Sequence, residues 1–170
     1  ITYVPGAHAT ITGTASQSVT HGSNATQVTA VAAFGYHFVK WDDLNANAIR
    51  TDLNITSSET YTVVVAPNVY NLVVTPRSHG TITPGDTTKE YLQSQTFTFT
   101  ADTGYYVETI TIDGVALTSS SIPSFTFARD NGYTFSNISD SHTVTAYFSG
   151  SAHVVTFNSQ GGSSVPNGSF

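Results

Sequence analysis

The 170-residue sequence has no cysteine and no methionine, and only 9% of its residues are charged. The absence of cysteine excludes disulfides, thiolate metal sites and a cysteine nucleophile. Five basic residues against eleven acidic ones give a formal net charge of −6, so the basic surface that nucleic-acid binding requires is missing. No apolar run approaches the roughly 18 residues of a membrane span. We therefore expect neither a nucleic-acid partner nor membrane insertion in this segment.

Hydroxyl residues replace the missing charges, with 28 threonines and 20 serines. Hydrophobic residues make up 39% of the sequence, whereas disorder goes with few apolar residues and a high net charge. We therefore expect a folded protein with a neutral, hydroxyl-rich surface. This composition, without cysteine, suits an exported protein, and we predict an extracellular or cell-surface location.

The sequence repeats itself internally, mainly with a shift of 71 residues that places His8 opposite His79. The matched segments are ITYVPGAHATIT (1–12) with LVVTPRSHGTIT (72–83), Gly35-Tyr36 with Gly104-Tyr105, and NITSSETYTVVV (54–65) with NISDSHTVTAYF (137–148). The spacing widens along the chain, which indicates an insertion of about ten residues near 117–132 of the second copy. We predict a first β-repeat module at 1–69 and a second at 70–149.

A third copy begins after the second. VVTFNSQGGSSVPNG (154–168) matches the opening of the second copy with a shift of 82. Residues 150–170 are therefore predicted to start a third repeat, within a longer array, or to form an exchanged or linker strand. A lone strand of this kind can complete a sheet in a neighbouring subunit by strand addition. The candidate strand-exchange residues are His153, Val154, Val155, Thr156 and Phe157.

The local patterns favour strands throughout. Apolar residues alternate with polar or small ones, and Gly, Pro, Asn and Asp clusters separate the runs. The sets predicted to share a face are Phe97 and Phe99; Val28, Ala30, Ala32 and Phe34; and Val144, Ala146 and Phe148. We predict an all-β fold of two tandem small antiparallel modules, sandwich- or grasp-like, plus the first strand of a third repeat. Residues 42–54 read as a loop with at most one helical turn.

The opening and middle of each copy resemble a known repeat. HVVTFNSQGGSSVPNG (153–168) is similar to the start of the internalin-type B repeat, and GYHFVKW (35–41) and GYYVETITIDG (104–114) resemble the middle of its divergent form. The resemblance implies a long bacterial or archaeal surface protein, in which such repeats form a stalk, spacer or adhesive segment. It carries over no catalytic residues, and we expect no enzyme activity and no cofactor.

GYHFVKWDD (35–43) holds the densest chemistry in the chain. Asp42 and Asp43 are adjacent, and adjacent strand residues point to opposite faces, so the pair suits a loop better than acid–base catalysis. A weak calcium site near Asp42, Asp43 and Asp52 is a minor alternative, and we predict no metal residues. Trp41 is predicted to pack in the core, because the corresponding position of the second copy holds Ile110 or Ile112, and a position that takes either Trp or Ile is used for its volume.

Other residues carry weaker signals. The aromatic residues could instead form a sugar-stacking platform, with Trp41, Tyr36, Tyr105 and Tyr106 as its members. His8 and His79 are isolated from other ligating residues and are predicted to cap turns, and Asp113-Gly114 suits a type I′ hairpin turn. Four sequons offer candidate glycosylation sites at Asn24, Asn54, Asn137 and Asn167.

Three functional hypotheses follow. The leading one is a non-enzymatic structural segment of a cell-surface stalk or adhesin, whose partners are neighbouring repeats of the same protein. The alternative is a subunit of an extracellular filament or sheath, joined to identical subunits through residues 150–170. A carbohydrate-binding module is the third. Surface glycans or a host or cell-surface protein are further candidate partners.

Overall fold

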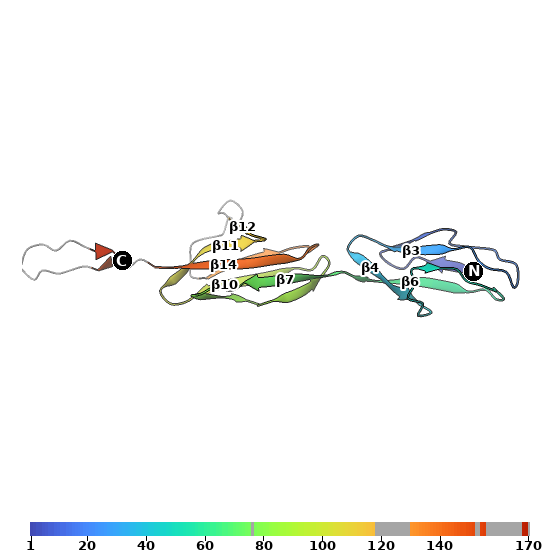
Figure 1. Ribbon diagram of the computed structural model, residues 1–170, viewed down its shortest axis with the longest axis horizontal. Helices are drawn as coiled ribbons and strands as arrows, with labels where there is room; N and C mark the ends of the chain where they lie inside the picture. The colour runs from blue at the N-terminus through green and yellow to red at the C-terminus, as the bar shows by residue number, and fades with distance from the viewer. Residues whose placement is uncertain (76, 118–129, 152–153, 156–167, 170) are drawn as a thin grey trace, which may run out of the picture. The chain divides into compact units, whose positions relative to one another are not determined.

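The computed structural model describes residues 1–75, 77–117, 130–151, 154–155 and 168–169 (Figure 1). The chain divides into two compact units, Ile1–Tyr70 with Glu90–Leu92, and Asn71–Lys89 with Gln93–Phe170. Every regular element in the described ranges is a strand, which confirms the all-β prediction of small tandem modules. The insertion predicted near 117–132 falls largely on residues outside the described ranges.

The first unit packs two three-stranded sheets against each other. Its strands are β1 (Thr2–Val4), β2 (Ala9–Thr12), β3 (Val28–Ala32), β4 (Tyr36–Trp41), β5 (Ile49–Arg50) and β6 (Thr60–Pro67). They pair in the orders β1-β6-β4 and β2-β3-β5. The core draws on both sheets, because alternate residues of a strand share a face. Its buried members are Tyr3, Val28, Ala30, Trp41 and Val63.

The second unit has the same layered build, with one three-stranded and one five-stranded sheet. Its strands are β7 (Val69–Thr75), β8 (Gly80–Thr83), β9 (Thr87–Glu90), β10 (Gln95–Ala101), β11 (Tyr105–Ile112), β12 (Val115–Ala116), β13 (Asp130–Phe135) and β14 (His142–Gly150). They pair in the orders β13-β10-β8 and β12-β11-β14-β7-β9. Phe97, Phe99, Val144 and Ala146 are buried, which confirms the predicted inward faces of β10 and β14. A separate two-stranded pair joins β15 (Val154–Val155) to β16 (Gly168–Ser169).

One predicted side-chain orientation, that of Phe34, is wrong. Phe34 was expected to continue the buried face of β3, but β3 ends at Ala32 and Phe34 lies in the following turn, 80% exposed. The alternation of β3 therefore holds only to its last residue. The tight turn before Gly35 reverses the chain into β4 and carries Phe34 away from the core.

A β-bulge in each unit sets which residues of the central strand face inward. The pairing of β4 with β6 shifts register between Phe38 and Lys40, and the pairing of β11 with β14 shifts between Val107 and Thr109. A bulge adds one residue to a strand and so changes which face the later residues occupy. It places Trp41 in the core, fully buried, as the sequence predicts.

One pairing in each unit departs from the antiparallel prediction. The first strand of each unit runs parallel to the last, β1 beside β6 and β7 beside β14 (Figure 1). Thr2 aligns with Thr60, and Leu72 with His142. Because the first and last strands run in the same direction, the chain enters each unit at one end and leaves it at the other.

Candidate functional site

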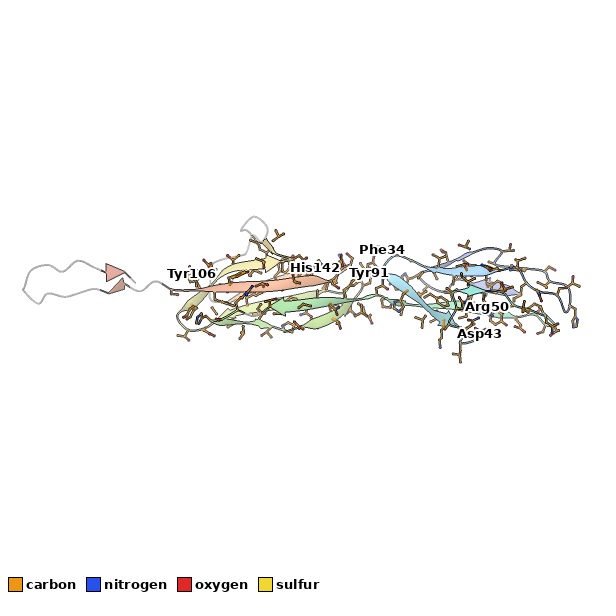
Figure 2. The ribbon with its side chains drawn as sticks, in the orientation of Figure 1. Phe34, Asp43, Arg50, Tyr91, Tyr106 and His142 are labelled. Carbon is orange, nitrogen blue, oxygen red and sulfur yellow. The ribbon has the colours of Figure 1, made fainter. Side chains whose placement is uncertain are left out.

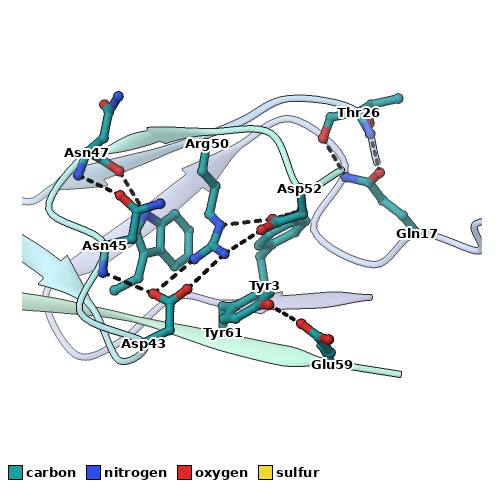
Figure 3. Close-up of polar contacts among 11 residues, drawn as sticks. Tyr3, Gln17, Thr26, Asp43, Asn45, Asn47, Arg50, Asp52, Glu59 and Tyr61 are labelled. Carbon is teal, nitrogen blue, oxygen red and sulfur yellow. Dashed lines mark hydrogen bonds and ion pairs between the residues drawn. The ribbon is translucent and has the colours of Figure 1, made fainter. Parts of the chain in front are cut away.

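The chemistry predicted around Trp41 is organised by a residue that the sequence analysis passed over, Arg50 on β5. Its side chain is 3% exposed, although arginine is almost never fully buried unless it is paired. Figure 3 shows its guanidinium between two carboxylates. It donates to Asp52 at 2.5 and 2.9 Å, and to Asp43 at 3.1 and 3.3 Å. Both contacts use the two-pronged geometry that suits a guanidinium and a carboxylate.

Aromatic rings complete the surroundings of Arg50. Its guanidinium carbon lies 3.7 Å from the ring centroid of Tyr61, 5.0 Å from Trp41 and 5.8 Å from Tyr3. The Tyr3 hydroxyl donates to Asp52 at 2.7 Å, and the Tyr61 hydroxyl donates to Glu59. A cation within about 6 Å of a ring is attracted by the ring quadrupole. The cluster of Arg50, Asp43, Asp52 and these rings is called the Arg50 cluster below.

The loop that carries Asp43 explains how this cluster forms. The side-chain oxygens of Asp43, Asn45 and Asn47 each accept the backbone N–H two residues ahead, at 3.2, 2.9 and 3.0 Å. The indole N–H of Trp41 donates to the Asn47 carbonyl at 3.0 Å. Short Asp and Asn side chains offer the backbone an alternative to helical bonds. The helical turn considered for residues 42–54 is therefore absent, and the loop leads instead to β5.

The electrostatics keep the cluster ionised. Burial opposes the charge on Asp52, but hydrogen bonds from Arg50 and Tyr3 outweigh it and lower the pKa of that carboxyl. Burial likewise opposes the charge on Arg50, and its bonds to Asp52 and Asp43 raise its pKa overall. The hydrogen bond to Glu59, with burial, raises the pKa of Tyr61 to about 12. The charged forms of Asp52 and Arg50 are thereby favoured, which suits a structural ion pair.

The calcium alternative is answered by the same geometry. Asp43 and Asp52 do converge, but on the guanidinium of Arg50, and Asp42 is exposed. Within the described ranges, no group of three or more His, Cys, Asp or Glu residues is placed to hold a metal ion. Asp42 and Asp43 begin a loop, as predicted, and the cation that Asp43 and Asp52 bind is a side chain of the same protein.

The largest ring proposed for the sugar-stacking platform, that of Trp41, is not accessible to a ligand. Trp41 is 0% exposed, which confirms its core role and leaves no indole face for a ligand. Tyr36 stacks on His8 with ring centroids 4.1 Å apart, and Tyr105 stacks on His79 at 4.0 Å. Each of these tyrosines therefore has one ring face covered within its own unit.

His8 and His79 lie in turns, as predicted, and both have left-handed backbones with φ of 58° and 72°. Their carbonyls accept matching backbone bonds, from Ala33 at 2.8 Å and from Asp102 at 3.0 Å. The tyrosine stacks were missed, although the repeat alignment pairs both histidines and both tyrosines. The recurrence of both residues in the repeat was the sequence signal that could have predicted the stacks.

A second polar contact closes the β11–β12 hairpin. Asp113 and Gly114 have φ of 52° and 78°, as the type I′ prediction requires. The Asp113 carboxylate accepts the Thr143 N–H at 2.7 Å and lies 2.7 Å from His142 Nδ1. Burial opposes ionisation of Asp113, but bonds from His142 and Thr143 lower its pKa. The labelled His142 in Figure 2 lies on β14, and its link to Asp113 was not predicted.

The remaining predicted sites are partly described. Asn24, Asn54 and Asn137 are exposed, and Asn54 and Asn137 occupy corresponding left-handed turns with φ of 51° and 53°. Asn167 lies outside the described residues. Of the strand-exchange segment, Val154 pairs with Ser169 and Val155 with Gly168. His153, Thr156 and Phe157 lie outside the described residues.

These features define a class of protein: a tandem all-β repeat whose densest polar cluster is closed within one unit. Residues 1–69 and 70–131 each match the divergent InlB B-repeat domain, and the chain belongs to this family. Domains of this kind are typical of bacterial cell-surface proteins. No curated protein and no solved structure matches the chain. Across the residues that the structure describes, no helix is long and apolar enough to span a membrane.

Proposed function

We propose that this chain is a non-enzymatic spacer segment of a bacterial cell-surface stalk or adhesin, located outside the cell. The observation that carries the proposal is the parallel pairing of the first and last strands in each unit. A unit that the chain enters at one end and leaves at the other adds length with every repeat. Antiparallel first and last strands would return the chain to the end where it entered.

The length that each repeat adds can be estimated from its longest strand. β14 has nine residues, and a strand rises about 3.3 Å per residue, so one unit contributes about 30 Å. In repeat proteins each unit contacts only its neighbours, so stability accumulates along the array. The low charge and the abundant Thr and Ser residues favour a surface that resists nonspecific electrostatic binding.

The polar groups also fit a structural role. The Arg50 cluster uses its charges on one another, since the guanidinium bonds two carboxylates and Tyr3 bonds one of them. Catalysis requires a nucleophile or base that can reach a substrate. The cluster ties β4, β5 and β1 together instead.

The spacer proposal is tested by measuring length against repeat number. Chains of one, two and three copies of residues 1–150 are compared by small-angle X-ray scattering and by electron microscopy. Each copy holds two repeats, so we expect the maximum dimension to rise by about 60 Å with every copy added, or about 30 Å per repeat. A maximum dimension that stays nearly constant as copies are added contradicts the proposal. A Trp41→Ala chain, whose first unit is destabilised, serves as the control for loss of folded length.

Filament assembly by strand addition is the second candidate. In the second unit β7 lies between β14 and β9, whereas β15, its counterpart by sequence, pairs only with β16 among the described strands. A strand from another subunit could occupy the side of β15 that β14 takes on β7. Light scattering of the chain with and without residues 152–170 tests this. High-mass assemblies that vanish on deletion support it, and the same monomer mass for both chains rejects it.

A further inference from the structure

The turn before β4 in the first unit holds a tyrosine from the loop Glu90–Leu92. Gly35 is buried, with φ of 81°, and the ring of Tyr91 fills the space that a Cβ on Gly35 would take. The Tyr91 ring meets the rings of Phe34 and Tyr36 edge-on, with centroids 5.8 Å apart in each case. The backbone N–H of Tyr91 donates to the Asn68 carbonyl at 2.9 Å. Phe34, Gly35, Tyr36 and Asn68 are called the first tyrosine socket.

The second unit builds the same turn from the matching residues of its own repeat. Tyr36 N–H donates to Ala33 in the first unit, and Tyr105 N–H donates to Asp102 in the second, both at 3.0 Å. The glycine carbonyls accept equivalent bonds at 2.8 Å, from Asn68 to Gly35 and from Ser151 to Gly104. The histidine stacks agree within 0.1 Å, at 4.1 and 4.0 Å. Thr103, Gly104, Tyr105 and Ser151 therefore form a second tyrosine socket.

The two sockets differ in whether they are filled. Gly35 is buried, whereas Gly104 is exposed, and no described atom lies within 4 Å of where a Cβ on Gly104 would be. Gly104 keeps the left-handed φ of 85° that favours glycine. Phe34 is replaced by Thr103, so one aromatic wall is smaller, but the tyrosine, the glycine and the backbone frame are retained.

We propose that the second tyrosine socket binds the tyrosine loop of a following repeat of the same kind. The glycine lets an aromatic ring approach the backbone, Tyr105 offers a ring for an edge-on contact, and the Ser151 carbonyl corresponds to the acceptor that Tyr91 N–H uses. Edge-to-face aromatic pairs are favourable beyond the area that they bury. The inference rests on the proposed function as a repeat segment, and it names how one repeat recognises the next.

The chain itself indicates where such a loop belongs. Tyr91 directly follows β9, and the sequence shift of 82 makes β15 and β16 the counterparts of β7 and β9. The equivalent loop of a third repeat would therefore begin close after β16. The occupant is the counterpart of Tyr91 in that repeat.

A three-repeat chain tests the proposal by NMR. Residues 1–150 are joined to residues 68–150 of a second copy, so that the residues after Gly150 are those that naturally follow Pro67. A tyrosine ring over a glycine shifts its Hα resonances upfield. In the chain of residues 1–170 we expect this shift at Gly35 and not at Gly104, and Tyr91→Ala should abolish the shift at Gly35.

In the three-repeat chain the first copy of Gly104 should gain an upfield shift similar to that of Gly35. The Hα resonances of the last copy of Gly104 should keep the chemical shift seen in the chain of residues 1–170, and they serve as the internal control. Replacing the appended Tyr91 with alanine should return the Hα resonances of the first Gly104 to their chemical shift in the chain of residues 1–170. A second chain, extended after Phe170 with residues 89–150, repeats the measurement with the natural junction sequence.

A folded third repeat with an unshifted Gly104, in either chain, overturns the proposal. A shift that survives the alanine substitution also overturns it, because the ring responsible would not be the tyrosine. Failure here is separable from failure of the spacer function, since the scattering experiment measures added length and does not depend on which side chain fills the socket.

Discussion

His8 stacks on Tyr36 with ring centroids 4.1 Å apart and ring planes within 7° of parallel. The second unit repeats the contact between His79 and Tyr105, at 4.0 Å and 5°. Both histidines hold a left-handed turn that faces the turn before the central strand. A contact kept in both units, while the neighbouring Trp41 and Arg50 are not repeated, belongs to the common frame of the module.

The stacking should be measurable as a coupling energy. In a double-mutant cycle of His8→Gly and Tyr36→Leu, we expect about 0.5–1.5 kcal/mol of coupling in the free energy of unfolding. Glycine suits the left-handed backbone, so the cycle reports on the rings and not on strain. Urea denaturation gives the values, and the cycle at His79 and Tyr105 should agree. Additive effects at both sites would contradict a stabilising stack.

Removing Arg50 should severely destabilise the first unit. Arg50→Leu leaves two carboxylates beside buried rings without their counter-charge, and breaking a buried ion pair in this way costs about 3–5 kcal/mol. Arg50→Lys should cost less, because it keeps the charge but loses the fork geometry. Combining Arg50→Leu with Asp43→Asn and Asp52→Asn should recover part of the loss. Chemical denaturation checks each value, with the exposed Arg77→Leu as the control.

The Arg50 cluster should make the first unit acid-sensitive. The pKa of Asp52 is lower in the folded than in the unfolded chain. Its contribution to stability is therefore present above the unfolded pKa and is lost as the pH falls through the folded pKa. We expect Asp52→Asn to lower stability at neutral pH and to flatten the acid limb of the unfolding free energy. Denaturation in steps of about one pH unit from pH 2 to pH 7 measures this, with Asp42→Asn, at an exposed position, as the control.

Gly80 should tolerate no side chain, because the Phe148 ring occupies the position of its Cβ. In the repeat alignment, Ala9 of the first unit takes the position of Gly80, and Val65 takes the position of Phe148. Gly80→Ala should therefore cost about 1–3 kcal/mol through overpacking. Adding Phe148→Val should rescue it, since the pair then matches the first unit. Gly85→Ala, where no atom of the described residues lies within 4 Å of the added Cβ, is the control.

Much of the fold was predictable because its signals are local. Alternation identified the inward faces of β10 and β14, and the Asp-Gly pair identified the β11–β12 turn. Phe34 was misplaced because alternation does not show where a strand ends. Arg50 was missed because a lone arginine gives no local sign that two carboxylates and three rings will converge on it.

The sequence by itself determined the repeat, the all-β class and the family, because these depend on residue order and side-chain period. Tertiary structure alone decided that Asp43 and Asp52 bind Arg50 and that the first and last strands of each unit run parallel. It also decided that Gly35 is covered by Tyr91 while Gly104, within the described residues, is open. The strand pairings and the Tyr91 contact join residues tens of positions apart. The Arg50 contacts are closer in sequence, but their energy depends on burial and geometry that no local pattern encodes.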